Sequence, residues 1–152
     1  VETDSLALSG LVTATMGVTY GFRYRVRNTY GWSDFSPITY ILAADAPMTP
    51  NKPQFLSATD NSISIKMFAA YDDNGAFVTS YILEMDQGDQ DTIFAEVTSY
   101  DQTSFLMSHT VTFATDGIQT GLIYSFRFKA INSKGHSDYS EYLSVAANSP
   151  PS

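Results

Sequence analysis

Residues 124–147 read YSFRFKAINSKGHSDYSEYLSVAA, and residues 20–43 read YGFRYRVRNTYGWSDFSPITYILA. The two stretches align without gaps at an offset of 104 positions, which places Tyr20 on Tyr124 and superposes basic, asparagine, glycine and serine positions. A repeat at the spacing of a whole domain sets the architecture of a chain before any local prediction is made. We therefore expect the 152 residues to hold one complete domain and part of another.

The first copy alternates between two kinds of side chain. Arg23, Arg25 and Arg27 point to one side of an extended chain. The alternate positions are aromatic or apolar and point to the other side, at Tyr20, Phe22, Tyr24 and Val26. A period of two with aromatic residues on one face predicts a half-buried strand over residues 20–28. The chain then turns, and residues 38–42 are expected to return as a second strand.

The remaining sequence also has the pattern of strands separated by turns. Apolar residues within 1–19 predict one strand, and further strands are expected at residues 59–68, 77–85, 93–100 and 104–113. Asn74-Gly75 ends a turn, because both residue types accept the positive φ angles of tight turns. No segment has the pattern of a helix. Short strands at intervals of about 8 to 12 residues are typical of a β-sandwich or barrel.

Composition argues against several classes of protein. The chain has no cysteine, so it has neither a disulfide framework nor a thiolate metal site. Its net charge of −8 argues against binding to nucleic acid or to anionic membranes. No apolar run is long enough for a membrane span, and the N-terminal residues lack the pattern of a signal peptide.

Two groups of motifs carry a family resemblance. The first group is SISIKM at 62–67, YDDNG at 71–75 and FVTSYILE at 77–84. The second group is GLIYSFRFKAIN at 121–132 and KGHSDYS at 134–140. In order, these groups resemble the B–C region and the F strand with its F–G loop in the fibronectin type III family.

The resemblance implies an all-β, immunoglobulin-like sandwich in which an A-B-E sheet packs on a C-C′-F-G sheet. Residues 53–148 resemble a complete domain, whereas residues 1–47 match only its last three strands, E, F and G. Residues 48–52 lie in a proline-rich segment that is expected to form a stiff linker, and residues 149–152 are expected to begin the next one.

The same resemblance implies a structural tyrosine. Tyr124, six residues after Ile118, fits a tyrosine corner, in which the phenol hydroxyl hydrogen-bonds to the backbone of the E–F connection. Tyr20 is the counterpart of Tyr124 in the first copy. Met67 stands where the family prefers tryptophan, so we expect a differently packed core there.

Candidate catalytic and metal-binding groups are few. His136 lies beside Ser137 and Asp138, but neighbouring side chains on an extended segment point apart and do not form a triad. His109 lies in a strand and is interpreted as a surface or hydrogen-bonded histidine. Carboxylates cluster at residues 72–73 and 86–91, but neither run has the spacing of a calcium loop. We expect no enzymatic activity, no cofactor and no metal.

Charge is distributed unevenly and predicts one ion pair. No lysine or arginine lies between Lys66 and Arg127, where nine acidic residues fall. In the expected sandwich, Glu84 and Asp86 lie on the outward face of strand C, beside Arg127 and Lys129 on strand F. Opposite charges on neighbouring strands attract. We therefore predict that Glu84 pairs with Arg127 or Lys129.

The first copy lacks the strands that would cover it. Arg23, Arg25 and Arg27 have no strand C beside them, and nothing in the sequence covers the aromatic face behind them. Either an upstream part of a longer chain or strands donated by another copy would complete the sandwich. These arginines and Trp32 are therefore the candidate interface residues. An aromatic platform of Tyr30 and Trp32 would favour sugar binding, but we interpret Trp32 as interdomain packing.

These observations favour a non-catalytic structural or interaction segment of a longer extracellular fibronectin type III array, adhesive or filament-forming through domain edges. The alternative is a ligand- or carbohydrate-binding accessory module of a larger secreted enzyme or receptor. The expected partners are other copies or neighbouring domains, without nucleic acid or membrane contact, and O-linked glycans on Ser and Thr are compatible with the sequence. We expect an extracellular or cell-surface location, with an intracellular array as the alternative.

Overall fold

The computed structural model describes residues 13–90, 92–103 and 105–149 of the chain. The chain divides into two compact units, Val1–Ala44 and Asp45–Ser152. The strand expected from the apolar residues near the N-terminus lies outside the described residues. Among the described residues, no helix has the length and apolarity needed to cross a membrane.

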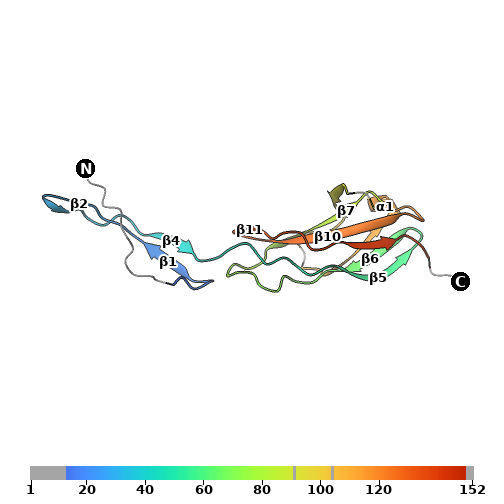
Figure 1. The fold of residues 1–152 in the computed structure, drawn as a ribbon, viewed down its shortest axis with the longest axis horizontal. Helices are drawn as coiled ribbons and strands as arrows, with labels where there is room; N and C mark the ends of the chain where they lie inside the picture. Colours follow the sequence, from blue (N-terminus) through green and yellow to red (C-terminus); the bar gives the residue numbers. More distant parts are fainter. Residues whose placement is uncertain (1–12, 91, 104, 150–152) are drawn as a thin grey trace. The chain divides into compact units, whose positions relative to one another are not determined.

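The second unit consists of two antiparallel sheets that face each other, with β7 and β10 in one layer and β5 and β6 in the other (Figure 1). The smaller sheet has the order β5 (Gln54–Thr59), β6 (Ser62–Lys66), β9 (Ser108–Thr112). The larger sheet has β10 (Ile123–Asn132) between β7 (Ser80–Asp86) and the strands β11 (Gly135–His136) and β12 (Leu143–Ala146), and β8 (Phe94–Glu96) pairs with β7. This order is the expected A-B-E sheet on a C-C′-F-G sheet, which confirms the predicted sandwich.

The core of this sandwich is filled by alternate residues of both sheets. Ile63 and Ile65 of β6 face Tyr81 and Leu83 of β7 across the core, because successive side chains of a strand point to opposite faces. The largest fully buried side chains belong to both sheets and to the connection before β10, and they include Phe126, Phe128, Ile63, Ile65, Met67, Leu83, Ile118 and Val111. Met67 is buried at the position that the family usually gives to tryptophan.

One short helix corrects the prediction that the chain has none. Helix α1 (Phe113–Asp116) follows β9 and lasts one turn. Thr112 Oγ1 accepts a hydrogen bond from Thr115 N at its start, and Gly117 ends it with φ 76°. Such a turn is too short to show the helical period in a sequence. The strands expected at 93–100 and 104–113 are shortened to β8 and β9.

The proline-rich segment packs on the second unit. Pro47, Pro50 and Pro53 are buried, and Met48 N donates a hydrogen bond of 3.0 Å to Asp72 O. The division between the units falls after Ala44, ahead of the expected linker at 48–52. The segment is therefore part of the second unit's structure over most of its length.

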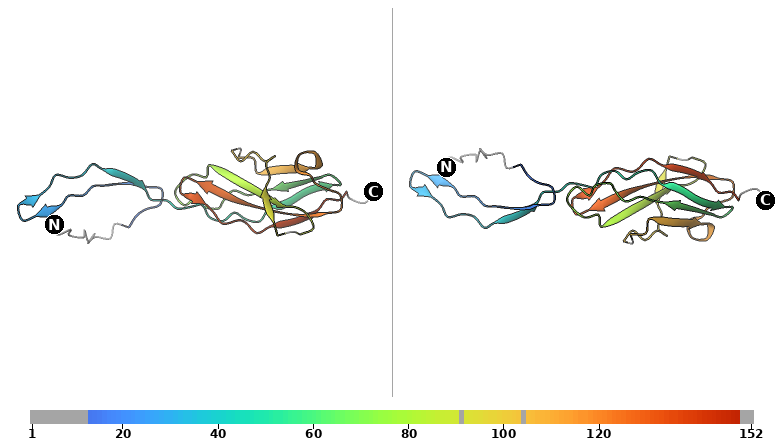
Figure 2. Two further views of the ribbon diagram at one scale, coloured as in Figure 1. Left: turned by 90° about the horizontal axis from the view of Figure 1, so that it is seen from above. Right: turned by 90° about the horizontal axis from the view of Figure 1, so that it is seen from below.

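The first unit is a long hairpin (Figure 2). Its strands are β1 (Thr19–Phe22), β2 (Arg27–Asn28), β3 (Gly31–Trp32) and β4 (Thr39–Leu42). The pairing Tyr20↔Ile41 in this unit has the same register as Tyr124↔Val145 in the second unit. The repeat in the sequence is thus a repeat of one hairpin in space.

The two copies differ in strand continuity. Residues 20–28, expected as one strand, form β1 and β2 with an interruption at residues 23–26. The equivalent positions of β10 are continuous, because β7 pairs with Phe126 through Ile131. A strand without a second neighbour loses half of its backbone ladder, which explains the interruption.

Candidate interaction surface

Each copy of the hairpin has its own tyrosine corner. Tyr124 Oη accepts a hydrogen bond of 2.9 Å from Gln119 N, and Ile118, one residue earlier, is fully buried. Tyr20 Oη accepts an equivalent bond of 2.8 Å from Thr15 N. The structure thus gives both tyrosines the bond to the preceding connection that a tyrosine corner requires.

Two serines fix the far end of each hairpin in the same way. Ser36 Oγ accepts a hydrogen bond of 3.0 Å from Tyr24 N, and Ser33 Oγ accepts one of 3.0 Å from Val26 N. The corresponding bonds of the second unit run from Phe128 N to Ser140 Oγ and from Ala130 N to Ser137 Oγ. These bonds hold the returning chain beside the strand where regular pairing stops. They leave the opposite edge of the strand open to a different partner.

A row of stacked cations and aromatic rings covers the outer face of the first unit. The guanidinium carbon of Arg23 lies 4.0 Å from the ring centroid of Phe35, and that of Arg25 lies 4.8 Å from the same ring. Arg25 and Arg27 lie 4.3 Å and 5.5 Å from the Trp32 centroid. We call these five residues the arginine ladder. Contacts of this kind each contribute about 0.5–1 kcal/mol at exposed sites.

The arginine ladder has no carboxylate partner among the described residues. The single ion pair found there joins Arg127 and Glu84, both in the second unit. Three like charges on one strand repel each other, and cation–π contacts leave their charge in place. The ladder therefore presents positive charge on a chain whose net charge is −8.

The inner face of the same hairpin is exposed. Phe22 is 50% exposed and Tyr24 is 65% exposed, whereas their counterparts Phe126 and Phe128 are both 0% exposed. Ile41 on the returning strand, the register partner of Tyr20, is also exposed, whereas its counterpart Val145 is buried. A contiguous apolar face of this kind marks an interaction surface.

The second unit has the equivalent row of cations and aromatic rings, and in this row a carboxylate pairs with one of the cations. Arg127 lies 4.0 Å from the centroids of both Phe94 and Tyr139, and Lys129 Nζ lies 4.5 Å from the Tyr139 centroid. Arg127 Nη2 lies 2.7 Å from Glu84 Oε2, and Glu84 is its register partner on β7. This pair confirms the predicted contact between strands C and F.

Tyr139 joins the same carboxylate. Its hydroxyl donates to Glu84 Oε1, so both oxygens of Glu84 are occupied. Burial, and then the hydrogen bond to Glu84, raise the pKa of Tyr139 above its ordinary value. Sequence reasoning missed the rings of Phe35 and Tyr139 in both rows. Their signal is that they occupy equivalent positions of the repeat, one residue before Ser36 and Ser140.

A buried asparagine closes the end of the second unit near β11. Asn132 Nδ2 donates to Asp45 O, Asp73 O and Ala76 O at 2.7, 3.0 and 3.1 Å. Its counterpart in the first unit, Asn28, accepts a bond from Tyr30 N but donates to no described residue. The carbonyls that receive the Asn132 amide lie in two segments, at Asp45 and at residues 73–76, and have no counterpart in the described part of the first unit.

The two candidate catalytic histidines, His136 and His109, have separate sets of contacts. His136 is exposed, and its ring nitrogen Nδ1 contacts the backbone oxygen of Ser137. His109 Nε2 lies 2.9 Å from Ser99 Oγ, which donates to Asp116 Oδ1. The Ser99 hydroxyl proton is therefore directed at a carboxylate, and the serine accepts from the histidine. This order of contacts is the reverse of the one that activates a serine nucleophile.

The acidic runs serve local turns in the part of the chain that the structure describes. Asp72 and Asp73 accept bonds from Asn74 N and Gly75 N, the positive-φ residues of the predicted turn. Asp86, expected on the outward face, is instead 1% exposed and accepts bonds from Gly88 N and Ser125 N. No cluster of three or more metal-binding side chains occurs among the described residues.

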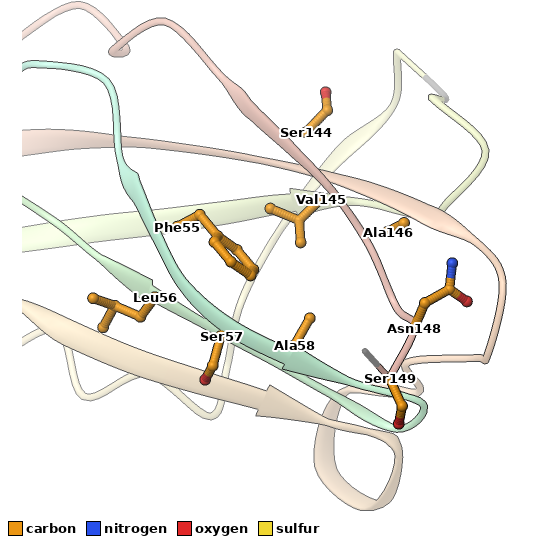
Figure 3. Close-up of a pocket in the computed structure, with 9 residues that line it drawn as sticks. All are labelled: Phe55, Leu56, Ser57, Ala58, Ser144, Val145, Ala146, Asn148 and Ser149. Carbon is orange, nitrogen blue, oxygen red and sulfur yellow. The ribbon is translucent and has the colours of Figure 1, made fainter. Parts of the chain in front are cut away.

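An apolar groove of about 580 Å³ lies along β5 and β12, the edge strands of the two sheets. Phe55 and Val145 point toward each other across it, whereas Ser57 and Ser144 point away (Figure 3). Its lining residues include no charged group. Its polar side chains are those of serine and asparagine.

Comparison with known proteins agrees with this geometry. No family model matches the chain. The E3 ubiquitin-protein ligase TRIM9 of Drosophila melanogaster is 35% identical over 101 residues, which cover 66% of this chain and 12% of that protein. The chain thus spans only a small part of that relative's length.

Several solved structures share the fold. A fourth FNIII domain from human is 27% identical, with a TM-score of 0.58, covering 72% of this chain and 87% of that one. Domains of titin give a TM-score of 0.62 at 21% identity and cover 80% of this chain and 38% of that one. The chain is thus an all-β protein with an immunoglobulin-like sandwich. More specifically, it is a fibronectin type III domain protein.

Proposed function

We propose that the chain is a non-catalytic structural and interaction segment of a longer extracellular fibronectin type III array, adhesive or filament-forming. In this proposal its contacts run through domain edges, including strand complementation between subunits. Its partners are neighbouring domains or other copies of the same protein, without nucleic acid or membrane contact. O-linked glycans are part of the same proposal.

One observation supports the proposal above the others. The chain contains the same hairpin twice, with the same register, the same serine bonds and the same tyrosine corner. One copy is covered by a second sheet, and the other has an exposed aromatic face. A repeated element with an uncovered apolar face is what a segment of a modular array presents to its neighbour.

The candidate chemistry of the molecule also supports a non-catalytic role. The Ser99–His109–Asp116 contacts run in an order that does not activate the serine, and the groove along β5 and β12 is lined without charged groups. The likeness to a solved series of domains from titin supports a module of an array.

The alternative, a carbohydrate-binding accessory module, has less support. Sugar platforms need an aromatic ring with a free face, and Trp32 is the candidate. Arg25 and Arg27 both lie over the Trp32 ring, which reduces its availability for stacking on a sugar. Tyr30 is nearly fully exposed, but a single ring is a weak platform.

The test is the assembly state of the chain and of the protein from which it comes. Electron microscopy and light scattering of the purified chain should show filaments or concentration-dependent association, and the native polypeptide should contain further copies of the repeat. Because the proposal places the protein outside the cell, labels that do not cross the membrane should modify it on intact cells. The proposed array would be overturned if the purified chain stayed monomeric at high concentration and the native polypeptide had the same length as this chain.

A further inference from the structure

We propose that a pocket of the second unit binds the guanidinium group of an arginine side chain from a partner protein. The pocket is lined by the end of β7, by β8 with the residues after it, and by α1 with the connection to β10. Its carboxylates are those of Asp86, Glu96 and Asp116. The site lies wholly within the second unit, so the proposal goes beyond the proposed array and does not depend on it.

The pocket has a buried floor and an exposed rim. Its volume is about 340 Å³, and the buried residues Asp86, Val97 and Tyr124 form part of its lining. The exposed polar side chains of its rim are Gln87, Thr98, Thr115 and Gln119. A ligand that satisfies the floor must therefore carry its polar group on a long, narrow stem.

One carboxylate oxygen of the floor lacks a hydrogen-bond donor. Asp86 is 1% exposed, and its Oδ1 accepts hydrogen bonds from Gly88 N at 3.2 Å and from Ser125 N at 2.9 Å. Its Oδ2 is buried and has no hydrogen-bond partner among the described residues. A buried carboxylate oxygen without a donor is costly. Such an atom in the lining of a pocket indicates a ligand that supplies the donor.

The pocket holds negative charge without a cation of its own. Its lining residues include no lysine, arginine or histidine. The Asp116 carboxylate already accepts three hydrogen bonds, so it adds charge rather than free acceptors. Glu96 is exposed and has no hydrogen bond or ion pair within the described part of the chain. A cation with several hydrogen-bond donors matches this set of groups.

An arginine side chain matches the pocket better than a metal ion does. No three carboxylate or histidine side chains of the described residues lie close enough together to hold a metal, and calcium takes six or more oxygen ligands. A guanidinium group has five donors in a planar fork, so it serves acceptors that lie apart. The methylene groups of its stem would pack on the apolar lining residues Met85, Ala95 and Val97.

Arginine also matches the pocket better than lysine does. The ammonium group is a compact charge that is more strongly hydrated, so its transfer to a buried floor costs more. The second unit cannot fill its own pocket, because its only arginine, Arg127, is paired with Glu84. We therefore assign the pocket to an arginine side chain that another polypeptide contributes.

The experiment titrates matched peptides into the full chain. An acetylated and amidated Gly-Ser-Arg-Ser-Gly peptide presents one arginine. The same peptide with citrulline keeps the shape without the charge, and the peptide with lysine keeps the charge without the fork. The amide signals of Gly88 and Ser125, which bond to Asp86, report on the floor by NMR. We expect saturable shifts of both signals with the arginine peptide, and binding weaker by about 10-fold or more with the other two.

Two variants test the carboxylates, and one serves as a control. Asp86→Asn keeps an oxygen for Gly88 N and Ser125 N and replaces the unpartnered oxygen by a donor, so it should keep the fold and weaken the arginine peptide by roughly 10- to 100-fold. Glu96→Gln should weaken it by about 3- to 10-fold. Glu141→Gln makes the same change of charge outside the pocket and should leave binding unchanged. Thermal unfolding checks that each variant is folded.

Several results would overturn the proposal. They are equal binding of the citrulline or lysine peptide, calcium binding that shifts the same two amides more strongly, and no shift with any peptide at millimolar concentration. If Asp86→Asn fails to fold, Glu96→Gln and the control peptides decide. Binding of N-acetyl-arginine methylamide without binding of the peptide would assign the pocket to a small guanidinium compound and overturn the partner protein. These outcomes are independent of the assembly state that tests the proposed function.

Discussion

Phe22 and Phe126 occupy equivalent positions of the same hairpin, yet the first is 50% exposed and the second is 0% exposed. Their local surroundings agree closely. Phe22 pairs with Thr39 and Phe126 pairs with Leu143, in matching registers, and each hairpin has a tyrosine corner before it. The difference comes from the strands β5 to β9, which exist for one hairpin only in the part of the chain described.

The comparison separates the features that the hairpin's own sequence determines from those that depend on other strands. Turn, register and serine bonds are encoded within about 25 residues, because they recur in both copies. Burial of the aromatic face is supplied from elsewhere, and it contributes about 2–3 kcal/mol for each large side chain. A two-stranded hairpin without that burial is marginally stable in water. The aromatic face of the first unit is therefore suited to packing against strands other than those described in this unit.

The largest expected effect is the loss of a ring from the buried copy. Phe126→Ala should destabilise the chain by about 3–5 kcal/mol, because it opens a cavity in the core, whereas Phe22→Ala should change stability by within about 0.5 kcal/mol. Urea unfolding followed by circular dichroism measures both. Equal losses from the two variants would show that the face of the first unit is already covered in solution, and the comparison would fail.

The asparagines give the next largest contrast. Asn132→Ala removes five side-chain hydrogen bonds and leaves the carbonyls of Asp45, Asp73 and Ala76 without that donor, at a cost of about 2–3 kcal/mol. Asn28→Ala removes one exposed bond from Tyr30 N and should cost about 0.5 kcal/mol. Thermal unfolding of the two variants tests this. A large cost at Asn28 would reveal a partner for its amide.

Much of this contrast is visible in the sequence, because the features that repeat are short-range. Alternation predicted the strand over residues 20–28, and the offset of 104 positions extended that prediction to the strand that contains Phe126. Strand order then followed from the family resemblance, which was enough to predict that Glu84 pairs with Arg127 or Lys129. A period of two indicates which side chains share a face of the sheet. Once the strand order is known, the shared face indicates which side chains of neighbouring strands lie side by side.

Other features depend on contacts that no local pattern records. Asp86 lies two residues after Glu84, so the alternation predicts the same outward face for both. Asp86 is instead buried and accepts hydrogen bonds from Gly88 N and Ser125 N. The Ser99–His109–Asp116 contacts join a turn, a strand and a one-turn helix at separations of 10 and 17 residues. Only the fold brings such groups together, so the interpretation of His109 as a hydrogen-bonded side chain could not name its partners.

A smaller effect distinguishes the two cation rows. Glu84→Gln should cost about 1 kcal/mol, because Arg127 loses its ion pair in a partly buried site, and 1 M salt should reduce the difference from the parent chain. The matched variant Arg23→Gln removes a cation that has no carboxylate partner among the described residues. It should cost no more than the cation–π contact with Phe35 contributes, about 0.5–1 kcal/mol, and that cost should change little with salt. Salt-dependent destabilisation by Arg23→Gln would mean that the arginine ladder is already paired.

The smallest expected effect is a loss of folding stability at acidic pH. Burial lowers the pKa of His109 below 6.5, and the nearby Asp116 carboxylate opposes this only in part. Burial pushes the pKa of Asp116 up, but hydrogen bonds from Ser99, Thr115 and Thr112 outweigh it and hold that pKa below its usual value. For both groups the folded state binds the proton more weakly than the unfolded state does. Stability is therefore present above the unfolded pKa and is lost as the pH falls through the folded one.

For His109 the loss should begin as the pH falls below about 6.5, and Asp116 should extend it below about pH 4. His109→Gln should flatten the first part of this dependence, while the exposed His136→Gln serves as the matched control and should keep the parent's slope. The repeat has Ser5 and Val12 at the positions equivalent to His109 and Asp116. The dependence therefore belongs to the second unit, and Trp32 fluorescence in the first should not follow it. Parallel acid transitions at both units would show that they unfold as one body.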